Sequence, residues 1–244
     1  MKGLYPIFKR EVLAYFRSPV AYVFIIIFLI ASAGCTFLLG NFYDSNQASL
    51  EIFFLFHPWL YLFLIPAVGM RLWAEERRSG TGELLLTLPV RTTVTVLAKF
   101  LAGWAFVAVA LGLTFPMVFT VHYLGQPDNG PIITGYLGSI LMAGAYLAIS
   151  SFTSATTKNQ VISFILSVSI CLILVLSGWG VMSGILNSVL PVWVTDLISQ
   201  FSFTTHFDAM RRGVVDLRDL VFFISIIIFM LMTNVLVLES KKAS

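Results

Sequence analysis

The sequence predicts an all-α integral membrane protein with six transmembrane helices. Hydrophobic residues make up 58% of the 244-residue chain and charged residues only 11%, a charged fraction about half that of a typical soluble domain. Several apolar runs reach the length of about 20 residues that crosses a bilayer as an α-helix. Six such helices use most of the chain, so we expect residues 1–244 to form a single membrane domain.

The first 19 residues are expected to form an amphipathic helix in the plane of the membrane interface. Leu4, Phe8 and Tyr15 recur at helical spacing with basic residues between them, a pattern typical of interfacial helices. Pro19 ends this helix and lets the chain turn into the bilayer. A basic flank that only orients the first span is the equally open alternative. The first apolar run has full length and no small-residue cleavage site, so we expect it to stay as an anchor.

Windows with few charged residues define the expected spans, because charged side chains are costly at the centre of a bilayer. The expected spans are residues 20–39, 52–72, 96–121, 132–152, 161–183 and 220–238. Alanines and glycines at four-residue spacing in the third and fourth spans predict close helix packing, within the chain or between two copies.

Basic residues predict the orientation of these spans. With the N-terminus in the cytoplasm, 12 of the 15 Lys and Arg residues fall on the cytoplasmic side, as the positive-inside rule requires. The other three are Arg211, Arg212 and Arg218. We therefore expect both termini in the cytoplasm.

The connection between the second and third spans, residues 73–91, concentrates charge between two apolar runs. Its charged side chains are Glu75, Glu76, Arg77, Arg78, Glu83 and Arg91. The spacing predicts that Glu75 pairs with Arg78, and that Glu76 and Arg77 face a partner protein. A solvated loop that only orients the spans is the alternative.

A short helix is expected within this connection. Gly80 or Thr81 begins it, Glu83 lies in its positively polarised first turn, and Pro89 ends it. The helix would carry an apolar ridge formed by Leu84, Leu85 and Leu88. Neither acidic residues nor a leucine ridge helps to orient spans, so we expect this segment to seat in a groove of a partner protein.

Residues 186–206 are too polar to span the membrane and too apolar to be a free loop. Val194, Leu197 and Phe201 share one helical face, with polar residues opposite. We expect short outer helices that dip into the outer leaflet before the last span. The candidate residues for an outer gate or a partner contact are Trp193, Asp196, Phe201, His206, Asp208, Arg211 and Arg212.

One pattern resembles a known family. Glu75-Glu76-Arg77, Gly80-Thr81, Glu83, Leu85-Leu86 and Pro89 resemble the cytoplasmic signature of the ABC-2 type permeases. The chain is most similar to the gliding-motility-associated permease subgroup, which shares the amphipathic N-terminus and the approach to the last helix in residues 207–219. The resemblance covers essentially the whole chain, and the cytoplasmic signature is its specific part.

The resemblance implies a permease subunit of an ATP-driven ABC-2 transporter, an exporter of the bacterial inner membrane. Residues 75–89 would be the coupling helix, seated on one of two ABC ATPase subunits that hold ATP and Mg. A second permease chain, identical or paralogous, would complete a dimer in the lipid bilayer. The subgroup often has a companion subunit with a large extracytoplasmic domain. No nucleic-acid partner is expected.

The chain itself is not expected to be an enzyme. It contains no Gly-x-x-x-x-Gly-Lys-Ser/Thr phosphate loop, so ATP hydrolysis is expected on a partner. Cys35 and Cys171 each lie in an apolar run without a second ligand nearby in sequence, so no metal or other cofactor is expected on this chain.

Two other functions stay open at this point. The chain could transmit ATP hydrolysis mechanically to an extracytoplasmic partner without passing a cargo. A remote alternative is an intramembrane hydrolase, with Ser183 as nucleophile and His206 as base, which would need both within hydrogen-bond reach. Ser183 and Gly184 more simply end a helix.

Overall fold

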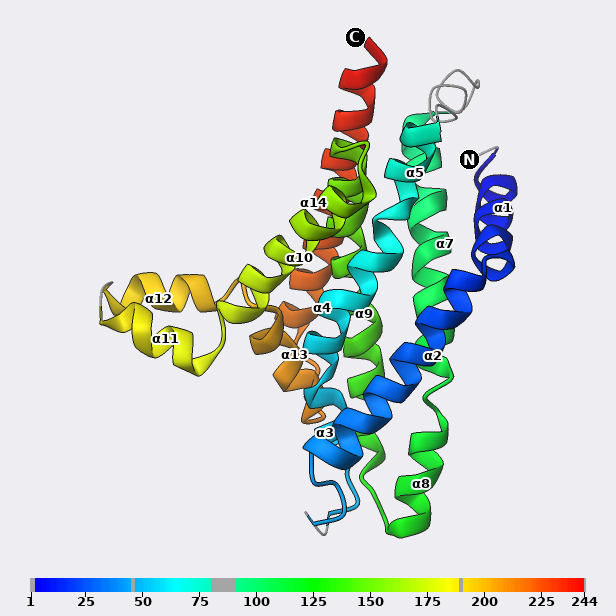
Figure 1. The fold of residues 1–244 in the computed structure, drawn as a ribbon. Coiled ribbons are helices and arrows are strands. Elements are labelled where there is room, and N and C mark those ends of the chain that lie inside the picture. The colour runs from blue at the N-terminus through cyan, green and yellow to red at the C-terminus, as the bar shows by residue number, and fades with distance from the viewer. Residues whose placement is uncertain (1–2, 45–46, 80–90, 189–190, 244) are drawn as a thin grey trace.

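The computed structural model describes residues 3–44, 47–79, 91–188 and 191–243, and every regular element in these ranges is helical. The expectation of an all-α fold is confirmed. Most helices pack side by side in a long bundle, while α11 and α12 project from its flank (Figure 1).

The helix bounds in chain order are α1 Leu4–Arg17, α2 Pro19–Gly34, the π-helix η1 Cys35–Leu39, α3 Glu51–Leu55, α4 His57–Gly69, α5 Arg71–Ser79, α7 Thr92–Gly112, α8 Pro116–Leu124, α9 Asn129–Thr156, α10 Gln160–Leu176, α11 Gly180–Asn187, α12 Val192–Ser199, α13 Phe203–Arg211 and α14 Leu217–Ala243.

Four helical stretches among the described residues are long and apolar enough to cross a membrane. They are Pro19–Leu39, Thr92–Leu124, Asn129–Thr156 and Leu217–Lys241. The expected second and fifth spans correspond to shorter pieces, α3 to α5 and α10, whose lengths alone do not establish a crossing. The six-span expectation is therefore supported for four spans.

The third and fifth expected spans are each interrupted in the structure. The third, residues 96–121, is divided between α7 and α8, because Pro116 lacks the N–H that would continue the backbone hydrogen bonds of α7. The fifth, residues 161–183, ends at Leu176, and α11 starts anew at Gly180. Ser183 and Gly184 consequently lie inside α11 rather than at the end of a helix.

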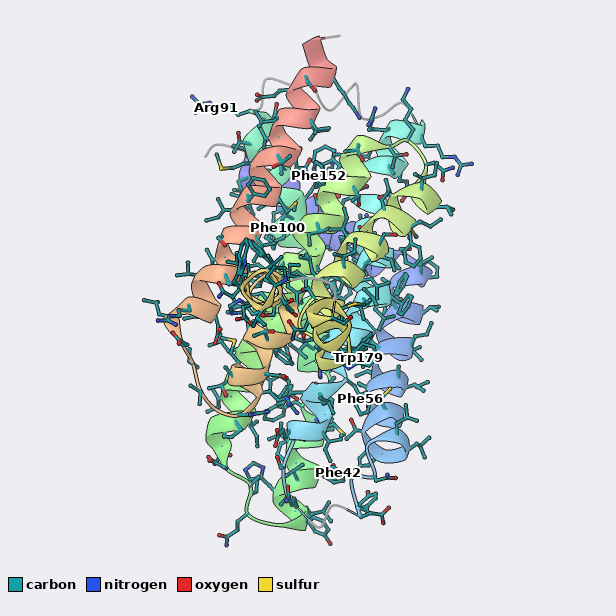
Figure 2. The ribbon with its side chains drawn as sticks, turned by 90° about the vertical axis from the view of Figure 1, so that its left-hand side faces the viewer. Phe42, Phe56, Arg91, Phe100, Phe152 and Trp179 are labelled. Atoms are coloured by element: carbon teal, nitrogen blue, oxygen red, sulfur yellow. The ribbon has the colours of Figure 1, made fainter. Side chains whose placement is uncertain are left out.

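Both chain ends lie at the same end of the bundle, which we call the terminal end (Figure 1). Arg91 also lies there, and Phe42 lies near the opposite end (Figure 2). α2 and α7 run away from the terminal end, whereas α9 and α14 run toward it (Figure 1).

Helix α9 is the centre of the bundle. It contacts α3, α4, α5, α7, α10, α13 and α14, and all residues from 142 to 151 are buried. Most of the described bundle core is therefore positioned against one helix, while α1 and α2 pack on α7 and α4.

Small residues of α9 allow this close packing. A Cβ added at Gly138 would crowd Met210 of α13, and one added at Gly144 would crowd Ile227 of α14. Both contacts lie within one chain, so these two glycines serve intrachain packing, one of the two alternatives that the sequence left open.

The helical hydrogen-bond pattern is interrupted at Met70, between α4 and α5, and a side chain of α9 binds the backbone groups on both sides of the interruption. The first turn of a helix has N–H groups without intrahelical partners, and a bilayer offers no water to satisfy them. Ser154 Oγ accepts from the backbone N–H groups of Trp73 at 3.0 Å and Ala74 at 2.9 Å, and it donates to the Met70 carbonyl at 2.7 Å. One hydroxyl thus satisfies both sides of the break.

The substitution Ser154→Ala removes all three of these hydrogen bonds and should destabilise the chain. We expect the free energy of unfolding to fall by about 2 kcal/mol, the cost of leaving buried polar groups unpaired. Unfolding by sodium dodecyl sulfate, followed by circular dichroism, measures this loss. Ser225→Ala is the control, since its hydroxyl bonds only to the Phe222 carbonyl of its own exposed helix surface. Equal unfolding curves for the two variants would refute the role of Ser154.

Candidate functional site

A buried lysine joins three helices at the terminal end. Lys99 of α7 is 2% exposed. Its Nζ lies 2.8 Å from Glu76 Oε1 of α5 and 3.4 Å from Glu11 Oε2 of α1, and it donates to the Leu72 carbonyl at 3.2 Å. The ammonium also lies 5.2 Å from the centre of the Trp73 ring, within cation–π range. We call Glu11, Glu76 and Lys99 the Lys99 cluster.

The Lys99 cluster satisfies the requirements of a buried ammonium. A lysine has three N–H donors and no acceptor, and here three oxygen atoms surround it. A buried charge without such partners would be strongly destabilising. Arg10 adds to the cluster from outside, 2.6 Å from Glu11 Oε1 and 3.8 Å from Glu76 Oε1. The four side chains together carry no net charge.

The position of the Lys99 cluster matters because α5 and α7 flank the connection of residues 80–90. The cluster ties the helix that enters this connection to the helix that leaves it, and it ties α1 to both. The three helices α1, α5 and α7 therefore meet at one buried ammonium.

The charged residues of α5 divide into two groups. Glu76 and Arg77 face the chain itself, since Glu76 contacts Lys99 and Arg77 donates to the Ala155 carbonyl at 2.6 Å. We expected these two side chains to face a partner; both are partly exposed, and a contact with a partner stays a prediction.

Glu75 and Arg78 are the exposed members of the same helix. Glu75 Oε2 and Oε1 accept from Arg71, one turn earlier, at 2.9 and 3.3 Å. The expected pairing of Glu75 with Arg78 is therefore replaced by a pairing with Arg71. Both exposed side chains are accessible from solvent beside the connection.

The C-terminal end of α9 lies under this helix and is held by two cations. Arg77 and Lys241 both donate to the Ala155 carbonyl, and Lys241 also donates to the Thr156 carbonyl at 2.8 Å. The last carbonyls of a helix lack intrahelical donors and carry partial negative charge. α5 and α14 are consequently joined through the end of α9.

Six of the expected coupling residues lie outside the described residues: Gly80, Thr81, Glu83, Leu84, Leu85 and Leu88. Arg91 is exposed and lies at the terminal end of the bundle (Figure 2).

A second polar cluster lies before the last helix. His206 of α13 contacts Asp219 of α14 through Nδ1 at 2.7 Å and the Gln200 carbonyl, just after α12, through Nε2 at 2.8 Å. The imidazole stacks on Phe222 with 3.9 Å between ring centres. Both ring nitrogens therefore face oxygen atoms of the chain. His206 thus joins α12, α13 and α14.

Arg211 anchors the same region to the outer part of the bundle. The buried guanidinium lies 3.3 Å from Glu51 of α3 and 3.2 Å from Asp208, three residues earlier on α13. Arg212 is exposed. Arg211 and Asp208, both expected outer residues, are therefore paired with each other within the chain.

The α11–α12 hairpin presents the other expected outer residues to its surroundings. Both helices point toward the viewer from the bundle in Figure 2, with Trp179 at their base. Trp193 is 66% and Phe201 64% exposed, and Asp196 is also exposed. The hairpin is thus a projecting, partly apolar surface.

The geometry gives no support to a serine hydrolase. Both nitrogens of His206 face other acceptors, and the Ser183 side chain lies outside the described part of the structure. His57 is fully buried and contacts the Phe53 carbonyl through Nδ1. In residues 3–44, 47–79, 91–188 and 191–243, no group of three His, Cys, Asp or Glu residues could hold a metal ion.

Sequence reasoning missed the residues that organise these clusters. From the sequence, Lys99 and Lys241 are only orientation signals, Asp219 is part of the approach to the last helix, and Glu11 and Ser154 have no assigned role. Lys99 did carry a signal, because it lies inside an expected span, deeper than a residue that only orients the chain needs to be.

Comparison with known proteins identifies one family. The model of the ABC-2 family transporter proteins matches residues 41–238, most of the chain. No curated protein matches the chain.

The substitution Lys99→Met tests the Lys99 cluster. It keeps the length of the side chain but leaves two partly buried carboxylates without their shared cation, so we expect a loss of about 3 kcal/mol in unfolding free energy. Adding Glu76→Gln should recover part of the loss, and a double-mutant cycle in detergent measures the coupling. Lys158→Met, at an exposed lysine, is the control. Additive effects of the two substitutions would contradict the ion pairing.

The substitution His206→Phe tests the second cluster. Phenylalanine can keep the stacking on Phe222 but makes neither hydrogen bond, so we expect a loss of about 2 kcal/mol and faster hydrogen exchange in α12 and α13. Exchange read by mass spectrometry separates this local effect from global unfolding. Unchanged exchange in both helices would show that His206 does not hold them.

Proposed function

The chain belongs to the ABC-2 family of transporter membrane proteins, whose membrane domain has no catalytic activity of its own, and we propose that it is one permease subunit of an ATP-driven exporter. Two ABC ATPase subunits would bind ATP and Mg and hydrolyse the nucleotide. A second permease chain, identical or paralogous, would complete the membrane part. The similarity to gliding-motility-associated permeases makes that subgroup our proposed placement.

Connectivity supports six crossings of the membrane. α2 and α7 run in the same direction, so the chain must return between them, and α3 to α5 make that return. α9 and α14 also share a direction, so α10 and the helices after it bring the chain back. At 17 residues, α10 has the minimum length for a crossing.

The distribution of basic residues supports a cytoplasmic location for the terminal end. In this orientation α5, the connection of residues 80–90 and the start of α7 face the cytoplasm of a bacterial inner membrane. The His206 cluster and the α11–α12 hairpin then belong to the outer half.

The observation that carries the coupling proposal is the Lys99 cluster. Closure of the ATPase subunits around ATP would displace the connection of residues 80–90, with Glu75 and Arg78 available for contact beside it. Because Lys99 binds Glu76 and Glu11, α5, α7 and α1 would move together. Movements of packed helices of this kind are a known form of conformational switching.

Mechanical transmission without cargo is the second candidate function. The projecting α11–α12 hairpin favours it, since Trp193, Leu197 and Phe201 are exposed on a surface suited to an outer partner. A companion subunit with a large extracytoplasmic domain would be that partner.

Affinity purification from the native membrane in mild detergent tests the permease proposal. We expect an ATPase with a phosphate-loop motif to co-purify with the tagged chain, and Glu83→Lys to reduce its recovery at least fivefold, on the order of 1 kcal/mol of lost binding. Asp196→Lys makes the same charge change on α12 and should not alter the recovery. Absence of any ATPase from the wild-type sample would overturn the proposal.

A further inference from the structure

Three neighbouring cavities lead from the junction of α1, α5 and α7 to the space between α2, α4 and α7. The first has a volume of about 310 Å³ and lies between α1, α5 and α7. It shares Tyr15, Ser18 and Arg71 with a second hollow of about 20 Å³. The second shares Phe24 and Phe106 with a third of about 30 Å³. Because each cavity shares lining residues with the next, the three follow one another along the bundle.

The lining of this row changes from charged to apolar with distance from the terminal end. Glu11, Arg71, Glu75, Glu76 and Lys99 line the first cavity. The third is lined by aliphatic and aromatic residues such as Phe28, Leu64 and Val107. A polar head and an apolar tail in this order describe an amphiphile with its head at the membrane surface.

The length of the row matches one leaflet. Ten positions separate Ser18 from Phe28 on α2, and ten separate Tyr61 from Arg71 across α4 and the start of α5, so both walls are about 15 Å long. Half of the hydrocarbon core of a bilayer is also about 15 Å thick. Each of the two smaller hollows has room for only a group or two of methylene size, so an acyl chain would lie along the groove rather than inside it.

The charges that line the first cavity favour a zwitterionic head group. Three carboxylates and two cations line it, and Arg10, bonded to Glu11 from outside, balances the set. A zwitterionic head preserves this neutrality, whereas an anionic head adds an unbalanced charge beside the carboxylates.

The hydrogen-bonding side chains that remain accessible in the first cavity narrow the choice of zwitterionic head group. The Lys99 donors are taken by oxygen atoms of the chain, but Arg71 and Glu75 are paired only with each other among the described residues and are 30% and 48% exposed. Arg71 can donate to a phosphate, and carboxylates accept N–H donors. Burial of Tyr15, helped by nearby Glu11, raises the pKa of its phenol, so that hydroxyl stays neutral. A primary ammonium donates three hydrogen bonds, and a quaternary ammonium donates none.

We propose that this groove binds one phospholipid of the leaflet at the terminal end, with a phosphate and primary-amine head in the charged cavity and an acyl chain between α2, α4 and α7. The phosphate contacts Arg71 and the ammonium contacts Glu75. This binding is independent of the ATPase subunits, so the proposed transport function and the lipid site stand or fall separately.

The test uses the full chain in nanodiscs that contain equal amounts of phosphatidylethanolamine, phosphatidylcholine and phosphatidylglycerol. Native mass spectrometry after release counts the lipids that stay bound. We expect one phosphatidylethanolamine per chain, retained about tenfold over the other two lipids, and loss of this preference in the double variant Arg71→Gln/Glu75→Gln. Asp216→Asn/Arg218→Gln makes the same charge changes at exposed residues at the start of α14 and should behave as wild type.

A second measurement locates the acyl chain even if the double variant folds poorly. Phosphatidylethanolamine with a photoreactive diazirine on its acyl chain should label wild-type peptides from α2 and α7, and excess unlabelled phosphatidylethanolamine should suppress the labelling. Equal retention of all three lipids, equal retention by the double variant, or labelling spread evenly over the exposed faces of α10 and α14 would overturn the proposal.

Discussion

The structure depends on one constraint, that a peptide group buried away from water must find its hydrogen-bond partner within the protein. Helical hydrogen bonding is interrupted between α4 and α5, at Met70. The Ser154 hydroxyl of α9 binds the backbone groups on both sides of the interruption. Other hydroxyls of α9 serve similar ends: Ser151 bonds to the Trp73 indole and to Asn234 of α14, and Thr153 bonds to Ser167 of α10. The central helix is therefore a framework of polar contacts as well as an apolar core.

This framework decides where charge can be placed. Because Ser154 fixes the start of α5, Glu76 is directed toward Lys99, and the cation shared with Glu11 brings α1 onto α7. Tyr15 of α1 stacks on Phe106 of α7 with 5.2 Å between ring centres. Part of the apolar face of α1 is thus covered by protein, where the sequence suggested that lipid would cover it.

Hydropathy was sufficient to predict the long helices, because an apolar run of about 20 residues has few alternatives to a span. It could not predict the divided third helix or the early end of α10. Those features depend on single residues. Pro116 divides the third helix, and at Gly178, just after α10, an added Cβ would collide with the side chains of Ser202 and Thr205. The exposure of Glu75, Arg78 and Arg91 follows from their charge, and their role in coupling stays a prediction. The role of Lys99 was not predictable, because its partners are 23 and 88 positions away in the chain, and only the packed bundle brings them together.

The α11–α12 hairpin has a thermodynamic consequence. Its helices make their main contacts with each other and few with the bundle, so its unfolding removes little of the buried core. Regions of this kind open with a free energy well below that of global unfolding. We therefore expect the hairpin to tolerate sequence change better than α9, where a change of similar size would affect every helix around it.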